Sequence, residues 1–276
     1  MKNLFLLSIC TLLLVSCSRL KIAVDWADTF VLAGMEDYYE FSSHQSAQFK
    51  KEFRTILKDV EKSDFREFAS LLEAIVVSVE KNELSRDVIK THLEQGRGIL
   101  QKAIYKFEPL IQRVNDEQAS SNFEKYDREF KTKLAEDYKD LGNQKKAMKK
   151  HKASFDFWID QSIEFLTETQ EESLTKQLLE TQPPTRLRLD SKNSVHEKFV
   201  MARSDSVARK AFISKFMSSW ESLQTEVYLN ARKPYQEKLL DWMHQVAQTL
   251  TEKQKQNIIK NLKKRAGEFR SLSEAK

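Results

Sequence analysis

The chain has 276 residues, of which 32% are charged and 40% hydrophobic, and its formal net charge is +5. Five glycines and four prolines are too few for a many-stranded sandwich or barrel, in which turn residues recur about every 8–12 residues. Abundant Lys, Glu, Gln and Leu favour long amphipathic helices, and the small charge excess excludes the strongly basic character typical of nucleic-acid-binding proteins. We therefore expect an all-α protein with no nucleic-acid partner.

An apolar run over residues 4–16 follows Lys2 and ends at Cys17. Its last residues, Leu-Val-Ser-Cys at 14–17, resemble a bacterial lipobox, in which a peptidase cuts before the cysteine and the thiol carries a diacylglycerol. Residues 1–16 are thus predicted to be a signal peptide and Cys17 the lipid attachment site, with acyl chains such as palmitate. Several such chains hold a protein firmly at a membrane, since each buried methylene contributes about 0.8 kcal/mol. Ser18 favours sorting to the outer membrane, so we expect an anchor there with the protein facing the periplasm.

Two alternatives to the lipobox stay open, a plain secretory signal and an uncleaved anchor. A spanning helix needs about 20 apolar residues, whereas this run is shorter and is followed by Arg19 and Lys21. Cys10 lies within the predicted signal peptide and Cys17 is predicted to be alkylated, so no disulfide is expected. The stability of the protein must then come from an apolar core.

Apolar residues recur at steps of three and four along the chain, which predicts amphipathic helices. The first helices are predicted over 49–60, 65–79, 99–114, 123–138 and 155–166. Pro109 is expected to kink the third of these, and Gly142 to end the fourth. Gly96 and Gly98 lie in a helical stripe, where they favour close packing over a phosphate cradle.

Pro183 and Pro184 form the clearest interruption, because neither can continue a helix. We predict a linker or sharp bend over 181–192, between an N-terminal helical region at 17–180 and a C-terminal region at 193–276 that packs on it as one domain. Beyond the break, the pattern predicts a long helix over 199–227, a helix that begins at Pro234 and a last helix over 258–272. The whole is expected to be a multi-helix bundle or an elongated helical array.

A short motif occurs three times, at residues 41–45, 166–170 and 250–254: an apolar residue, a hydroxyl residue, two variable positions and a glutamine. This is the pattern of a capping box, in which hydroxyl and glutamine side chains satisfy backbone amides at a helix start. Each cap contributes about 1 kcal/mol. The motif also resembles the Leu-Thr-x-x-Gln signature of periplasmic helical envelope-stress chaperones, and both interpretations stay open.

The order of several motifs resembles an uncharacterised family of helical bacterial lipoproteins, domain-of-unknown-function family 6279. The matching features are Cys17 to Leu20, Asp25-Trp26, Asp37-Tyr38, Gln45, Tyr126 to Glu129, the basic run 145–150 before Trp158, the second and third copies of the repeated motif, and Phe269-Arg270. The chain departs from the family at Phe30, where a second tryptophan is expected, and lacks a glycine just after Trp158. The resemblance implies a helical lipoprotein and supplies no activity.

Three clusters are candidate surfaces for a ligand or partner. The first is a group of acidic and aromatic residues near the anchor that includes Asp25, Trp26, Asp37 and Tyr38. It suits a cationic or sugar ligand; in the alternative interpretation the acids cap helices or are solvated and the aromatics lie in the core. A basic run suits anionic lipid or cell-wall polymer, or else a solvated helix face; it includes Lys145, Lys146, Lys149 and Lys150. Aromatics around Trp158 favour a central core or an apolar groove for a client peptide or acyl chain.

Residues with catalytic spacing are not found. A helical zinc hydrolase would carry His-Glu-x-x-His, but His196-Glu197 is followed by Val200 where the second ligand belongs. We therefore predict no metal site, no cofactor and no catalytic residue. The expected function is binding or tethering at the membrane with an envelope partner of unknown identity, and the alternatives are a periplasmic chaperone or a wall- or lipid-modifying hydrolase with paired carboxylates.

Overall fold

The computed structural model describes residues 19–141, 149, 152–153, 156–157, 159–180 and 182–275. Within these ranges the ordered elements are eleven α-helices and one short 3-10 helix, without a strand, which confirms the all-α prediction. None of the described helices is both long enough and apolar enough to cross a membrane. The predicted signal peptide, Cys17, Gly142, Lys145, Lys146, Lys150 and Trp158 lie outside the described residues.

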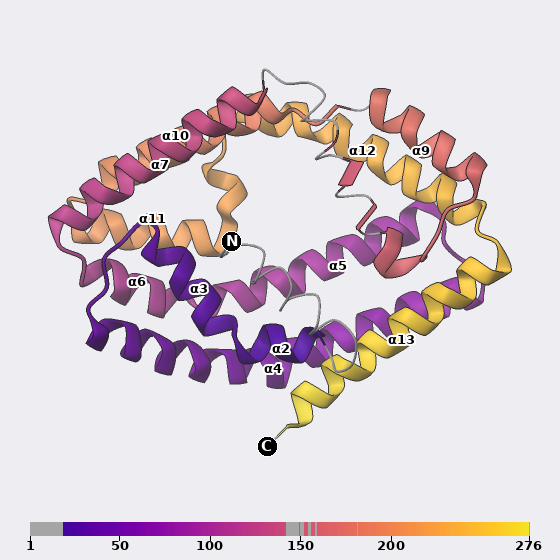
Figure 1. Ribbon diagram of the computed structural model, residues 1–276, viewed down its shortest axis with the longest axis horizontal. Helices are drawn as coiled ribbons and strands as arrows, with labels where there is room; N and C mark the ends of the chain where they lie inside the picture. Colours follow the sequence, from indigo (N-terminus) through magenta and orange to yellow (C-terminus); the bar gives the residue numbers. More distant parts are fainter. Residues whose placement is uncertain are drawn as a thin grey trace, which may run out of the picture.

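The helices follow one another around a closed oval (Figure 1). The N-terminal half contains α2 (Arg19–Asp25), α3 (Ala27–Glu36), α4 (Ser43–Glu80), α5 (Arg86–Tyr105), α6 (Glu108–Asp116) and α7 (Ser120–Leu141). The C-terminal half contains α9 (Glu168–Glu180), α10 (Thr185–Ala202), α11 (Ser206–Ser219), the 3-10 helix η1 (Trp220–Leu223), α12 (Glu226–Gln248) and α13 (Glu252–Glu274). Of the two predicted architectures, a helical array describes this arrangement better than a bundle does.

The last helix closes the oval by packing along α4. Phe269 stacks on Phe68 with ring centroids 5.6 Å apart and meets the edge of Phe65 at 5.1 Å. Arg270 Nε donates to Glu73 Oε1 at 2.8 Å. Lys263, two turns before Arg270 on α13, pairs with Glu80, which lies two turns after Glu73 on α4, at 2.8 Å, so the two helices are antiparallel.

The segment predicted as two helices, 49–60 and 65–79, is the single 38-residue helix α4, so that prediction was wrong. Its apolar stripe shifts face near residue 64, but no glycine or proline interrupts the backbone between the two parts. The helix begins with the expected capping box, in which Ser42 Oγ accepts from the Gln45 backbone amide and Gln45 Oε1 accepts from that of Ser42.

The prolines act differently from the predictions. The interruption at Pro183 and Pro184 is shorter than the predicted linker over 181–192, because α10 begins at Thr185. Proline has no backbone N–H, and a helix start does not need one. For the same reason Pro109 lies in the first turn of a separate helix, α6, instead of kinking a continuous one. Pro234 was expected to begin a helix but lies inside α12.

The helix predicted over 199–227 is divided into several elements. Helix α10 ends at Ala202, and Asp205 then caps α11 by accepting from the Ala208 backbone amide at 2.7 Å. Thr225 caps α12 by accepting from the amide of Tyr228. The caps were overlooked because apolar residues continue with helical spacing on both sides of them.

Gly96 and Gly98 both lie inside α5, as the stripe predicted. A Cβ atom at Gly96 would lie 3.3 Å from Leu71 Cδ2 of α4, whereas one at Gly98 would meet no atom within 4 Å. Close packing is therefore confirmed at Gly96, where α5 lies against α4.

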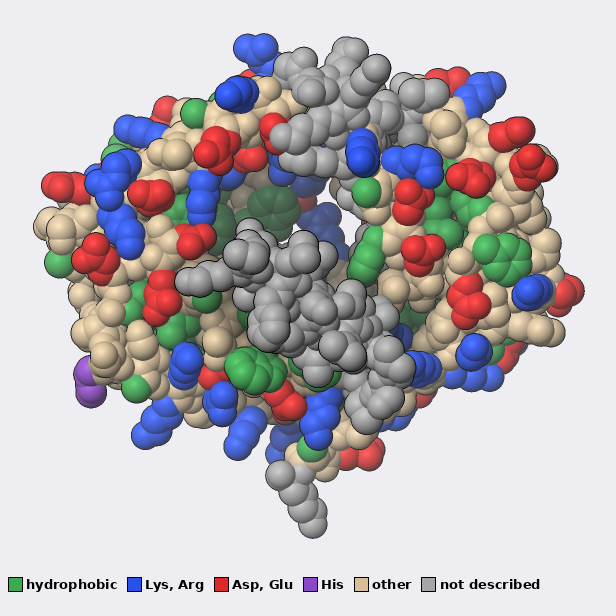
Figure 2. Space-filling model, viewed as in Figure 1, with side chains coloured by type: hydrophobic (Ala, Val, Ile, Leu, Met, Phe, Trp, Pro, Cys, Tyr) green, Lys and Arg blue, Asp and Glu red, His purple; other side chains and the backbone are tan. Residues whose placement is uncertain are grey.

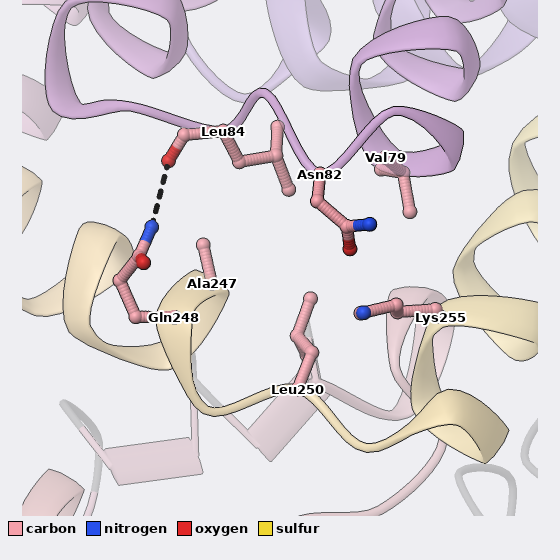
Figure 3. A pocket seen from close by; sticks show the side chains of 7 residues that line it. All are labelled: Val79, Asn82, Leu84, Ala247, Gln248, Leu250 and Lys255. Carbon is pink, nitrogen blue, oxygen red and sulfur yellow. Dashed lines mark hydrogen bonds between the residues drawn. The ribbon is translucent and has the colours of Figure 1, made fainter.

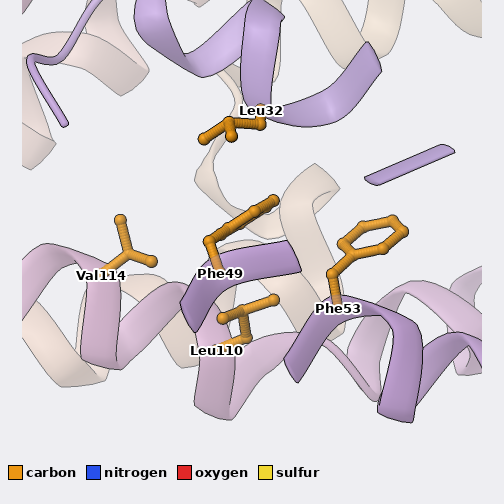
Figure 4. Close-up of a cluster of buried hydrophobic side chains, with 5 residues drawn as sticks. All are labelled: Leu32, Phe49, Phe53, Leu110 and Val114. Atoms are coloured by element: carbon orange, nitrogen blue, oxygen red, sulfur yellow. The ribbon is translucent and has the colours of Figure 1, made fainter. Parts of the chain in front are cut away.

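Buried apolar side chains form separate clusters around the oval. Figure 4 shows the first, in which Leu32 of α3 lies across from side chains of α4 and α6; its members are Leu32, Phe49, Phe53, Leu110 and Val114. A second joins α9 and the segment before it to α12; its members are Ile159, Leu174, Trp242 and Val246. A third joins α7 to α10 through Phe130, Leu134 and Leu189. This distribution leaves space between the clusters.

Candidate functional site

A cavity of about 810 Å³ lies among α4, α6, α7, α10 and α11. Its lining is mainly aromatic and aliphatic, with Phe107, Tyr126, Phe130, Phe199, Phe212 and Phe216 among the largest contributors. Figure 2 shows a hollow near the centre of the molecule with hydrophobic and basic side chains inside it, and acidic and basic side chains are spread over the surrounding surface. Pockets that bury small organic ligands have volumes of about 300–1,000 Å³ and a similar apolar lining.

One wall of the cavity is an aromatic ladder, which we define as Phe199, Phe212 and Phe216. Phe199 and Phe212 have ring centroids 5.4 Å apart, and Phe212 stacks on Phe216 one helical turn further along α11. Phe216 nevertheless exposes 45% of its surface. Burial of apolar surface is favourable by about 25 cal/mol for each Å² removed from water. An apolar ligand that covers the ladder would therefore be bound favourably.

The wall beside the ladder contains Tyr39 and Tyr126, whose rings are stacked with centroids 5.6 Å apart, and the Tyr126 ring meets that of Phe199 at 5.5 Å. Burial raises the pKa of Tyr126 to about 12 and also raises the pKa of Tyr39. Both hydroxyls are therefore neutral at ordinary pH, and this wall adds no charge to the cavity.

His196 is the buried histidine of this lining. Its ring stacks on Phe130 at a centroid distance of 3.9 Å, and its Nε2 lies 3.1 Å from Asp127 Oδ1. Asp127 also forms an ion pair with Arg203 at 2.8 Å. Burial lowers the pKa of His196, although Asp127 opposes this effect. The imidazole is therefore held neutral between α7 and α10.

The lowered pKa of His196 predicts a loss of stability in mild acid. The neutral imidazole contributes its full share of the unfolding free energy above the ordinary histidine pKa of 6.5. This share is lost as the pH falls from 6.5 toward the lower pKa of the folded state, because in that range the unfolded chain binds the proton and the folded chain does not. We expect His196→Gln to lose less unfolding free energy than the wild type between pH 7.5 and pH 5. Urea denaturation at both pH values measures the difference, and equal losses would contradict the prediction.

Two amide oxygens in the cavity lining lack partners among the described residues, Asn115 Oδ1 and Gln224 Oε1. Asn115 is only 7% exposed, and its orientation is set because Nδ2 donates to the Ile111 carbonyl at 2.9 Å. A buried acceptor without a partner costs about 1–3 kcal/mol. Both oxygens are therefore ready to accept hydrogen bonds from a ligand or from water.

The described cavity lining contains two charged side chains, and both are basic. They are Arg188 and Lys192, which are four residues apart and so lie on one face of α10. No Asp or Glu belongs to the described lining, and the described residues hold no metal-binding group of three or more His, Cys, Asp and Glu residues. The lining thus lacks the paired carboxylates that the hydrolase alternative requires.

A second, smaller space of about 130 Å³ lies between the turn after α4 and the turn before α13 (Figure 3). Asn82 has the left-handed φ of 57°, and Gln248 Nε2 donates to the Leu84 carbonyl across the gap at 3.5 Å. Since a water molecule occupies about 30 Å³, this space holds a few waters at most.

The described residues that were predicted to form surfaces do not line the large cavity. Asp25 and Trp26 are exposed at the junction of α2 and α3, and Lys149 is exposed. Asp37 pairs with Lys133 of α7 at 2.8 Å, and the same ammonium lies 4.3 Å from the centroid of the Tyr38 ring. Asp37 and Tyr38 therefore attach the segment after α3 to α7.

The second and third copies of the repeated motif meet each other in space. Thr167 with Gln170 and Thr251 with Gln254 each form the hydrogen bonds of a capping box. Gln254 Nε2 donates to Gln170 Oε1 at 2.7 Å, and Gln170 Nε2 donates to the Thr249 carbonyl at 2.8 Å. Capping is confirmed, and the resemblance to the chaperone signature stays a prediction.

No family model matches the chain, and no curated protein or solved structure is significantly similar to it. The resemblance to the lipoprotein family stays a prediction. The candidate site therefore depends on the geometry of the cavity alone.

Sequence reasoning did not identify the cavity. It placed Phe199, Phe212 and Phe216 on one long helix, where they read as an ordinary core stripe. The sequence did contain one signal, because the aromatic residues near His196 are more numerous than a single helix face can bury. Only the turn at residues 203–205 brings them together as a ladder.

Proposed function

We propose that the protein is a non-catalytic binding protein that holds a ligand with a large apolar part in the cavity. The proposal includes a lipid anchor at Cys17, by which the protein is tethered to the outer membrane and faces the periplasm. The observation that carries the binding function is the cavity of about 810 Å³ with its aromatic ladder and with two amide oxygens that lack partners among the described residues.

An apolar fluorescent probe tests the binding function. N-phenyl-1-naphthylamine is neutral and fluoresces more strongly in an apolar site than in water. We expect saturable enhancement with about one probe per chain, using the full chain with Cys17→Ser so that no attached lipid competes. A titration with no enhancement beyond that of a urea-unfolded sample would refute the proposed function.

A further inference from the structure

We infer that the ligand is a single-chain anionic amphiphile with a hydroxylated headgroup, of the lysophospholipid type, bound with its acyl chain along the aromatic ladder and its phosphate at Arg188 and Lys192. This inference rests on the proposed binding function and names the class of its ligand.

The basic pair supplies the charge complementarity. Lys192 Nζ lies 3.2 Å from Asp137 Oδ2 and 5.5 Å from the centroid of the Phe130 ring, while Arg188 forms no ion pair with any described residue. Asp190, which lies two residues after Arg188 on α10, accepts from the Tyr138 hydroxyl at 2.6 Å. A guanidinium offers five N–H donors in a fork that matches phosphate, so Arg188 is available to bind an anion beside Lys192.

The uncharged parts of the cavity suit the remaining parts of such a ligand. The ladder presents apolar surface to a chain, and each methylene that leaves water contributes about 0.8 kcal/mol. Asn115 Oδ1 and Gln224 Oε1 lack donors among the described residues, and headgroup hydroxyls are donors. The acyl groups predicted on Cys17 carry no anion, so the basic pair favours a free amphiphile over the protein's own anchor.

The test compares two ligands with the same lauroyl chain, lysophosphatidylglycerol with net negative charge and lysophosphatidylcholine with none. Displacement of the naphthylamine probe is measured below the micelle concentrations at low salt, on the full chain with Cys17→Ser. We expect the anionic ligand to bind about tenfold more tightly. The double variant Arg188→Gln, Lys192→Gln should lose this preference yet bind the zwitterionic ligand as before.

Arg186→Gln is the matched control, because Arg186 is exposed on the same helix and does not line the cavity. The Arg186→Gln variant should keep the preference for the anionic ligand. In the wild type, 0.5 M salt should reduce this preference, because salt screens exposed charges. Equal binding of both ligands by the wild type would overturn this inference and leave the binding function standing. Failure of the probe itself to bind would overturn both.

Discussion

Val195→Trp is expected to weaken binding of the neutral naphthylamine probe at least tenfold, which corresponds to about 1.4 kcal/mol. Val195 is half-buried on α10 and lines the cavity. An indole at this position occupies space that the ligand needs, and it adds no charge. The change in dissociation constant is measured by the fluorescence titration with the full chain.

Met201→Trp is the control for this substitution. Met201 lies on the same helix, is 74% exposed and does not line the cavity. It should bind the probe like the wild type. Circular dichroism and a thermal melt establish that both variants fold. A folded Val195→Trp variant with unchanged affinity would place the probe elsewhere.

Gln254→Ala is expected to lower the free energy of unfolding by more than about 2 kcal/mol, because each buried hydrogen-bonding group left without a partner costs about 1–3 kcal/mol. Gln254 is 0% exposed, its Nε2 donates to Gln170 and to the Phe165 carbonyl, and its Oε1 accepts from the Thr251 amide. Alanine removes all three of these hydrogen bonds, and among the described residues only Gln170 Oε1 keeps another one, from the Thr167 amide at 2.9 Å. Urea denaturation at pH 7.5 measures the loss.

Gln45→Ala provides the comparison, because Gln45 has the same role in the capping box of α4 but is only half-buried. We expect a loss of about 1 kcal/mol or less there. Equal losses at the two glutamines would show that the reciprocal contact with Gln170 adds no stability and that the motif acts only as a helix cap.

The local part of the fold could be predicted from sequence. Apolar spacing located α7 and α13, and the pattern Ser42 to Gln45 located the start of α4. These features depend on residues within one or two turns of each other. Errors occurred where one local signal has two outcomes, as at Pro234, which was expected to begin a helix but is tolerated within α12.

The candidate site was beyond such reasoning because its residues come from distant parts of the chain. His196 meets Asp127 across 69 positions, and Gln170 meets Gln254 across 84. Apolar periodicity marks a buried face but does not say whether that face meets another helix or a cavity. The spacing of Phe199 and Phe216 in the sequence is the same whether they pack against another helix or face a cavity.

A crystal structure with a bromine-labelled lauroyl lysophosphatidylglycerol would test the binding cavity most directly. Anomalous scattering locates the bromine at the end of the acyl chain without reference to the protein coordinates. A ligand bound as proposed places the bromine inside the cavity beside Phe199, Phe212 or Phe216, with the phosphate at Arg188 and Lys192. A bromine located only outside the cavity, with the aromatic ladder in contact with water alone, would contradict the proposed function.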